Sequence, residues 1–249
     1  MRVGQTEQDD FEARLQHDKL SAIKELAYGA SHEINNPLAN IAARAQTLLR
    51  DESEPDRRRA LQAIHQQALR AHEMISDLML FARPPRLELK PFDLCQLVER
   101  VVGELGSSSA RAVPQIAVNL PDEPIDLTGD SQQLAVAAQT VFLNAVEAVG
   151  ESGSIEISVS LGEVPNEAPT AAIAVKDNGP GLSDAAREHL FDPFYSGREA
   201  GRGLGFGLSK CWRIVTEHGG SVLVDSQPGQ GATVTLLLPL AGPSAKPAD

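Results

Sequence analysis

The stretch SHEINNPLANI, residues 31–41, lies inside a long helical pattern that runs from about residue 18 to residue 50. Pro37 cannot donate a hydrogen bond to the carbonyl of Glu33, so we expect a bend there, either one that flexes beside His32 or a static kink. His32 lies off the apolar face of this pattern. Steps of three and four between apolar positions predict that this face is buried. It comprises Ala27, Ala30, Ile34, Leu38, Ile41, Ala45 and Leu48.

A second helical pattern follows the break DESEPD, residues 51–56. Ser53 and Asp56 have the spacing of a capping box, and Pro55 suits a first helical turn. The apolar positions again alternate steps of three and four: Leu61, Ile64, Ala68, Ala71, Ile75 and Leu78. One antiparallel hairpin has too little surface to bury both stripes, so we predict that two chains form a four-helix bundle. The alternative is a hairpin that packs on the second domain of its own chain.

The prolines of ARPPRLELKP, residues 82–91, end the second helix and mark a domain boundary. From there to residue 240, short β-type runs mix with helical patterns near residues 94–106, 130–149, 183–190 and 205–218. This order predicts a layered α/β sandwich, and the chain as a whole is of the α+β class. We expect a helical leader over 1–17, the hairpin over 18–86, the sandwich over 87–240 and a disordered tail over 241–249.

Composition restricts the functional classes. A formal net charge of −12 argues against nucleic-acid binding, which depends on clustered Lys and Arg. Cys95 and Cys211 are isolated, so neither a disulfide framework nor a zinc site is expected and a reducing compartment fits best. No apolar run is long enough for a membrane span, so we expect a cytoplasmic protein or the cytosolic part of a longer receptor.

Two glycine-rich stretches indicate a nucleotide site. In VKDNGPGL, Asp177 ends a strand pattern and can accept a hydrogen bond from an exocyclic amine, although the same letters also make an ordinary turn. In GRGLGFGLSK, residues 201–210, the glycines precede a helix and offer backbone N–H groups to phosphates, or form a flexible surface hinge. The spacing excludes a Walker A loop and a dinucleotide fingerprint.

The helix expected over 130–149 begins with Asp130 as its cap. Asn144 lies on one side of it with Thr140 and Glu147, opposite the apolar face. An amide oxygen there suits Mg²⁺, which accepts few protein oxygens beside substrate phosphates.

Six motifs in order resemble the boxes of sensor histidine kinases of bacterial two-component systems, most closely the nitrogen-regulation type. They are SHEINNPLANI, FLNAVEAV, DNGPG, FDPFYS, GLGFGLS and PGQGATVTLLLP. The resemblance covers nearly the whole chain. It implies a homodimeric phosphoacceptor hairpin, an ATP-binding domain of the gyrase-like fold, and a response-regulator receiver domain as partner.

The resemblance also implies roles for single residues. His32 resembles the phosphoacceptor, Glu33 the base that polarises it, and Asn36 the residue that positions water when the kinase dephosphorylates its partner. Asn144 resembles the Mg²⁺ ligand and Asp177 the adenine-binding carboxylate. Residues matching the rest of the ATP site are Gly179 and Gly181 beside the adenine, Phe191 and Phe194 anchoring the lid, and Gly203, Gly205, Gly207 and Leu208 at the phosphates.

The chain departs from the family pattern at two places. Thr140 stands where a second Asn is usual, and Leu204 stands where the lid usually has Thr. These departures keep open a dimeric ATP-binding scaffold (pseudokinase) that transfers nothing. A second alternative, a gyrase-like ATPase or a serine kinase of this fold, is disfavoured by the complete HEINNP box. The remaining histidines, His218 among them, are expected at the surface.

Overall fold

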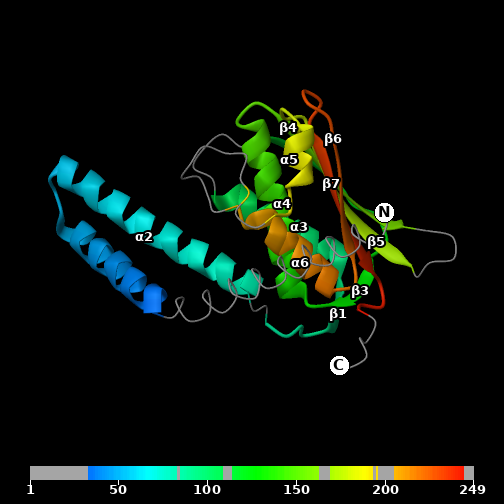
Figure 1. Cartoon of the computed structure of the whole chain (residues 1–249), viewed down its shortest axis with the longest axis horizontal. Coiled ribbons are helices and arrows are strands. Elements are labelled where there is room, and N and C mark those ends of the chain that lie inside the picture. Colours follow the sequence, from blue (N-terminus) through cyan, green and yellow to red (C-terminus); the bar gives the residue numbers. More distant parts are fainter. Residues whose placement is uncertain are drawn as a thin grey trace, which may run out of the picture. The chain divides into compact units, whose positions relative to one another are not determined.

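The computed structural model describes residues 33–82, 85–108, 114–162, 169–192, 195 and 205–243. The chain divides into two compact units, Met1–Pro85 and Arg86–Asp249. Helices and strands are labelled as in Figure 1. In the first unit, the helix over residues 33–51 and helix α2 (Pro55–Ala82) form the antiparallel hairpin that the periodicity predicts. The helix is continuous on both sides of Pro37, so the proline does not end it.

Local hydrogen bonds explain how the hairpin turns. The Glu54 carboxylate accepts from the N–H groups of Asp56 at 3.0 Å and Arg57 at 2.7 Å, so Glu54 caps α2 and the predicted capping box of Ser53 and Asp56 is wrong. The Arg58 guanidinium donates to the carbonyls of Leu49 and Glu52, which ends the first helix.

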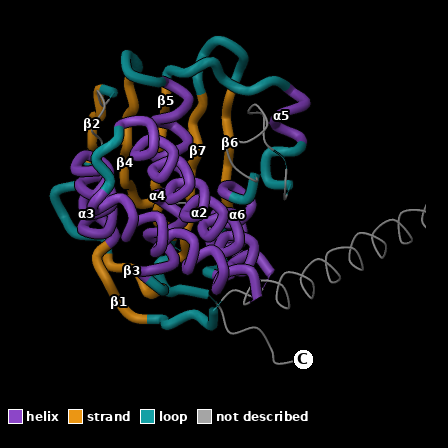
Figure 2. Tube along the Cα trace, turned by 90° about the vertical axis from the view of Figure 1, so that its left-hand side faces the viewer, coloured by secondary structure: helices purple, strands orange, loops and turns teal. Residues whose placement is uncertain are grey.

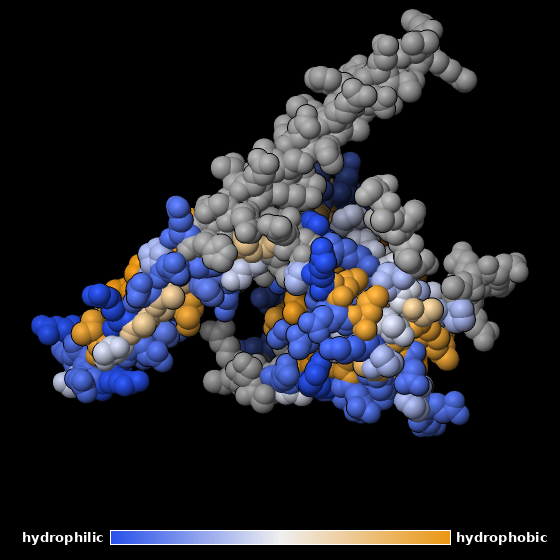
Figure 3. Space-filling model, turned by 90° about the horizontal axis from the view of Figure 1, so that it is seen from below, coloured by the Kyte–Doolittle hydropathy of each residue, from blue (hydrophilic) through white to orange (hydrophobic). Residues whose placement is uncertain are grey.

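Small side chains let the two helices approach each other. Ala42, Ala45 and Ala68 are buried between them, and Nδ1 of His65 donates to the Ala42 carbonyl at 3.0 Å. Other apolar side chains of the predicted stripes remain outside this contact. Ile34, Ile41, Leu48 and Ile64 are 39%, 46%, 60% and 48% exposed, and apolar side chains are visible on the hairpin at the left of Figure 3.

The second unit is a two-layer sandwich built on a five-stranded sheet in the order β2-β4-β5-β7-β6. The strands are β2 (Gln115–Asn119), β4 (Ser154–Gly162), β5 (Thr170–Asp177), β6 (Ser221–Ser226) and β7 (Ala232–Pro239). Among these described strands, β2 and β4 pair in parallel and the other neighbours pair antiparallel. Two short strands that the sequence patterns do not reveal, β1 (Lys90–Asp93) and β3 (Asp126–Gly129), pair with each other.

One layer of helices covers the sheet: α3 (Leu94–Ser108), α4 (Ser131–Val149) and α6 (Gly207–Glu217), as Figure 2 shows. Alternate residues of β4 and β5 point into the core beneath them, including Ile155, Ile157, Ile173 and Val175. The short helix α5 (Asp184–Glu188) is capped by Ser183. The expected α+β class and layered sandwich are confirmed.

The end of the described chain packs against this unit. Thr128 donates its N–H to the Leu240 carbonyl, and Gly242 adopts φ 76° where a side chain would meet the Thr128 carbonyl oxygen at 2.7 Å. Gly242 of the expected tail is therefore buried, whereas residues 244–249 lie outside the described residues. Among the helices of the described ranges, none combines the length and the apolar character needed to cross a membrane.

Candidate nucleotide and phosphoacceptor sites

Asp177 lies at the end of β5 and is only 8% exposed. Its Oδ1 accepts hydrogen bonds from the backbone N–H groups of Gly179 at 2.8 Å and Ala232 at 3.3 Å. Both donors use the same oxygen, so Oδ2 is the oxygen that can accept from a ligand. A carboxylate held in this way offers one oriented acceptor, which suits an exocyclic amine.

The loop after Asp177 is held by close backbone contacts. A Cβ at Gly179 would meet Asp177 Oδ1 at 2.9 Å and the Cβ of Ala148 at 3.1 Å. Gly181 has φ 68°, and a Cβ there would collide with the Gln227 carbonyl. These two glycines keep the predicted adenine loop against the end of α4 and against the β6–β7 turn.

Asn144 lies half-buried on α4 between two such contacts. One turn later, Ala148 meets the loop at Gly179; one turn earlier, the methyl group of Thr140 would lie 3.3 Å from a Cβ at Gly207, the first residue of α6. The structure therefore places Asn144 on α4 between the predicted adenine loop and the start of α6.

The amide oxygen of Asn144 is a hard donor of the kind that Mg²⁺ accepts together with phosphates. Groups of three or more His, Cys, Asp or Glu that would hold a metal ion are absent from the described residues. Mg²⁺ commonly takes most of its ligands from phosphate and water, so one amide oxygen from the protein suits it. The amide oxygen of Asn144 is a suitable single protein ligand.

Thr140, the position at which the family pattern usually has a second Asn, makes contacts within the protein. Thr140 is buried, and its Oγ1 donates back to the Val136 carbonyl at 2.8 Å. Its methyl group faces Gly207. Thr140 thus contributes packing between α4 and α6.

Of the residues predicted for the ATP lid, the structure describes Phe191 and those that lead into α6. Gly205 has φ 74°, and Phe206 beside it is 2% exposed and so anchors the start of the helix. Gly207 and Leu208 form the first turn of α6, and Phe191 lies half-buried in the turn after α5. Gly203 and Phe194, two further predicted lid residues, lie outside the described residues.

The predicted phosphoacceptor region lies at the start of the described hairpin. Glu33 and Asn36 are exposed on the first helix, and the Asn36 carbonyl accepts from the Asn40 side chain at 3.1 Å. His32 itself lies just before the described residues.

Sequence reasoning missed three residues that hold the nucleotide domain together: Asp130 in part, His218 and Ser226. Asp130 caps α4 as predicted, but its N–H also donates to Nε2 of His218 at 3.0 Å. His218 is 1% exposed, so the expectation that it lies at the surface is wrong. The Ser226 hydroxyl is bonded on both sides, to Leu182 and Gly231. No local motif reveals the bond from Asp130 to His218 or the bond from Leu182 to Ser226, because the residues joined are 88 and 44 apart in sequence.

Electrostatics at the start of α4 favour a charged cap. Burial alone would raise the pKa of the Asp130 carboxyl, but hydrogen bonds from the backbone N–H groups of Glu88, Gln133 and Gln132 and from the Gln133 side chain hold that pKa below its ordinary value. The cap is therefore ionised at neutral pH.

Comparison with known proteins assigns a family to each unit. Residues 22–86 match the His Kinase A (phospho-acceptor) domain, and residues 129–242 match the family described as histidine kinase-, DNA gyrase B-, and HSP90-like ATPase. His32 falls within the first match, and Asn144 and Asp177 fall within the second.

Curated relatives match most of this chain within longer chains of their own. The chain is 30% identical to the signal transduction histidine-protein kinase AtoS of Escherichia coli over 90% of its own length and 36% of AtoS. It is 31% identical to sporulation kinase C of Bacillus subtilis, over 91% of this chain and 51% of the relative. It is 32% identical to the C4-dicarboxylate transport sensor protein DctB of Rhizobium meliloti, over 86% and 34%. The chain thus spans between about a third and a half of these relatives.

Solved structures show the same fold. Full-length ShkA in complex with AMPPNP superposes with a TM-score of 0.74 at 24% identity, over 89% of this chain and 47% of ShkA. The histidine kinase AdeS of Acinetobacter baumannii superposes with a TM-score of 0.58 at 20% identity, over 84% and 98%. With a phosphoacceptor domain followed by a gyrase-like ATPase domain, and with these relatives, the chain belongs to the bacterial sensor histidine kinases and comprises their catalytic core.

Proposed function

We propose that the chain is an ATP-dependent histidine autokinase that phosphorylates His32 and passes the phosphoryl group to an aspartate of a response-regulator receiver domain. The observation that carries this proposal is the position of Asn144 on α4, between the loop that follows Asp177 and the first turn of α6. In this proposal Asp177, Asn144 and the start of α6 contact the adenine, the cation and the phosphates of one nucleotide.

In the proposed transfer, a ring nitrogen of His32 attacks the γ-phosphorus of ATP and the bond from that phosphorus to the β,γ-bridging oxygen breaks. ADP leaves with the bond electrons, and Glu33 accepts the proton from the imidazole. In the second step a receiver aspartate attacks the phosphorus, the N–P bond breaks, and His32 is regenerated. Asn36 is proposed to orient the water molecule that hydrolyses the receiver's phosphoaspartate when the kinase dephosphorylates its partner.

Nucleotide binding is assigned to the residues around Asp177. Its Oδ2 accepts from the adenine amine, which favours ATP over GTP because guanine presents an oxygen acceptor at the corresponding position. Asn144 holds Mg²⁺, which supplies neutralisation of phosphate charge when bound. The N–H groups of Gly205, Gly207 and Leu208 face the phosphates from the start of α6, and Phe191 anchors the lid.

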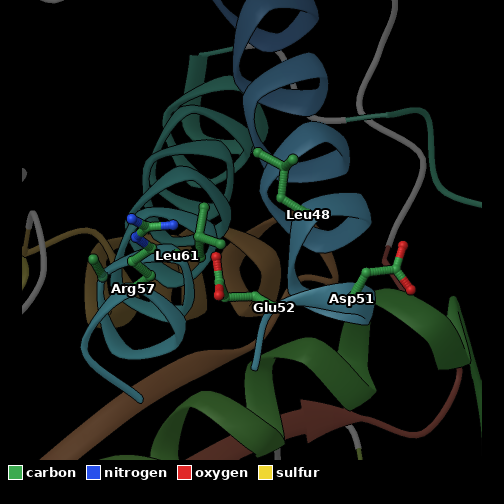
Figure 4. Close-up of a pocket in the computed structure, with 6 residues that line it drawn as sticks. Leu48, Asp51, Glu52, Arg57 and Leu61 are labelled. Atoms are coloured by element: carbon green, nitrogen blue, oxygen red, sulfur yellow. The ribbon is translucent and has the colours of Figure 1, made fainter. Parts of the chain in front are cut away.

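We propose a homodimer built on the exposed apolar seam of the hairpin. Ile34, Ile41 and Leu48 recur every seven residues on the first helix, and Ile64 is exposed on α2. Burying four half-exposed aliphatic side chains is favourable by about 25 cal/mol per Å² of apolar surface. At the hairpin tip, a cavity of about 480 Å³ lies between the helices, with Leu48 and Leu61 on its two sides and Glu52 and Arg57 nearby (Figure 4). Apolar side chains of the second chain are proposed to enter it.

The opposite flank of the first helix is proposed to receive the receiver domain. Ala43 and Gln46 are exposed there, away from the seam formed by Ile41 and Leu48. These small and polar side chains leave room for a partner element on this flank. Ala43→Glu and Gln46→Glu are expected to slow phosphotransfer without reducing autophosphorylation. Unchanged transfer by both variants would contradict this docking surface. The proposed location of the whole assembly is cytoplasmic.

Radiolabelling tests the proposal directly. Purified protein is incubated with γ-labelled ATP and Mg²⁺ beside His32→Ala and, as the matched control, His72→Ala, which removes an exposed histidine of α2. We expect acid-labile, alkali-stable label on the wild type and on His72→Ala, and none on His32→Ala. ATP binding without label would instead indicate a pseudokinase scaffold, and hydrolysis without labelled protein would indicate an ATPase.

A further inference from the structure

We propose that Ser226, outside every predicted motif, is a positioning residue that sets the place of Asp177 and so controls nucleotide affinity. Ser226 is the last residue of β6 and is 4% exposed. The inference rests on the proposed function, because it assigns a determinant of affinity to the same nucleotide site.

Both hydrogen-bonding capacities of the Ser226 hydroxyl are used. Its oxygen accepts from the backbone N–H of Leu182 at 2.9 Å, and its proton is donated to the Gly231 carbonyl at 2.8 Å. Leu182 ends the loop that begins at Asp177, and Gly231 belongs to the β6–β7 turn. The buried hydroxyl therefore links the loop after Asp177 to the β6–β7 turn. Ser226 and Leu182 are 44 residues apart in the sequence.

The same two loops touch at the backbone. Gly229 donates its N–H to the Pro180 carbonyl at 2.7 Å. Gly231 has φ 80°, and a Cβ there would collide with the Asp177 carbonyl, as a Cβ at Gly181 would collide with that of Gln227. The turn is pressed directly onto the adenine loop, and only residues without side chains permit this approach.

The turn also holds the carboxylate itself. Ala232, the residue after Gly231, donates its N–H to Oδ1 of Asp177 at 3.3 Å. The N–H of Ala232 orients the carboxylate so that Oδ2 faces the ligand. Displacing Gly231 would therefore shift this donor and change the orientation of the carboxylate. Ser226 fixes Gly231 through its proton and the far end of the loop through its oxygen, so it acts on Asp177 from both directions.

The bridge extends to the segment that precedes the lid. Nη1 of Arg187, on α5, donates to the Ser226 carbonyl at 3.3 Å, and Nη2 pairs with Asp184 at 2.8 Å. The Ser226 carbonyl thus accepts a hydrogen bond from α5, and its hydroxyl accepts one from the adenine loop. A change at Ser226 is expected to act on nucleotide binding before it acts on phosphoryl transfer.

A double-mutant cycle tests this inference. The dissociation constant for Mg-ADP is measured by calorimetry for wild type, Ser226→Ala, Asp177→Asn and the double variant. Ser221→Ala, at the exposed start of the same strand, is the control. We expect Ser226→Ala to weaken binding about threefold to tenfold, the size of one lost hydrogen bond, and to weaken it by less than about twofold once Asp177 is already changed. Ser221→Ala should bind as the wild type does.

Each outcome separates the two proposals. Weaker binding by Asp177→Asn with unchanged binding by Ser226→Ala overturns the role of Ser226 and leaves the proposed function intact. Equal losses from Ser226→Ala in both backgrounds also overturn it, because Ser226 would then act independently of Asp177. Absence of binding by the wild type overturns both proposals.

Protein folding is monitored by thermal unfolding, since a hydroxyl buried between loops also contributes to stability. Ser226→Cys keeps the size of the side chain with a weaker donor and acceptor, and should fall between Ser226→Ala and wild type in affinity. At saturating ATP, autophosphorylation by Ser226→Ala should approach the wild-type rate while its KM for ATP rises. A lower maximal rate of Ser226→Ala with an unchanged KM for ATP would contradict a positioning role.

Discussion

The backbone N–H of Asp130 donates a hydrogen bond to Nε2 of His218 across 3.0 Å. The other ring nitrogen, Nδ1, lies 2.8 Å from the Ile214 carbonyl, which can only accept, so Nδ1 is the donor and Nε2 the acceptor. This single tautomer joins the end of α6 to the start of α4. The bond therefore fixes the relative position of the helices that carry Gly207 and Asn144.

Replacing this ring should destabilise the protein. We expect His218→Phe to lower the free energy of unfolding by about 2 kcal/mol, because a buried N–H of Asp130 loses its acceptor. Urea unfolding followed by circular dichroism at pH 7 measures the change. His189→Phe, at a half-exposed histidine of the same unit, should change stability by less than about 0.5 kcal/mol. Similar losses in both variants would show that the hydrogen bond to Asp130 has no special role.

The Asp130 carboxyl should make stability depend on pH. Its pKa is held below the ordinary value of 3.8 in the folded chain, so the ionised form stabilises the fold above that value and this contribution is lost as the pH falls through the folded pKa. Asp130→Asn should therefore differ most from wild type in melting temperature near pH 7, and the difference should shrink as the pH falls below 3.8. Asp225→Asn, on the exposed edge of β6, is the control. A difference that grows toward acid would contradict this sign.

Charge in the apolar seam should separate the proposed dimer. Ile41→Glu with Leu48→Glu places two carboxylates on the exposed stripe, where burial against a second chain would desolvate them. Analytical ultracentrifugation should show a monomer at concentrations where the wild type is a dimer. Ala43→Glu, on the other flank of the same helix, should remain dimeric. A dimer that persists in the doubly charged variant would place the interface elsewhere.

The contact between Thr140 and Gly207 predicts compensation between two substitutions. Gly207→Ala should lower the melting temperature and weaken Mg-ADP binding, because the new Cβ would lie 3.3 Å from the Thr140 methyl and push α6 from α4. Thr140→Ser removes that methyl, so the combined variant should recover. The control is Gly103→Ala on α3, where nothing lies within 4 Å of the new Cβ. Failure of Thr140→Ser to rescue Gly207→Ala would indicate that this contact does not set the spacing of α4 and α6.

Local sequence was sufficient for features whose causes are local. Apolar spacing predicted the hairpin and the helices of the sandwich, alternation predicted five strands, and the position of Asp130 predicted the cap of α4. Each depends on neighbours within a turn or a strand. The four-residue strands β1 and β3 escaped because such short segments carry too little periodicity, and the capping box was misplaced by one residue because the longer Glu54 side chain reaches the same N–H groups.

The motifs determined which residues form the candidate site, whereas the tertiary structure decided how they are held. Nothing near His218 or Ser226 in the sequence distinguishes them, because each has one hydrogen-bond partner that is distant in sequence: Asp130 lies 88 residues from His218, and Leu182 lies 44 residues from Ser226. Likewise, only folding brings Thr140 against Gly207 and Gly231 against Asp177. The methyl group of Thr140 fits against Gly207, whereas any side chain at position 231 would collide with the Asp177 carbonyl. Sequence periodicity therefore determined the elements, and steric fit with hydrogen bonding between distant loops decided the geometry of the site.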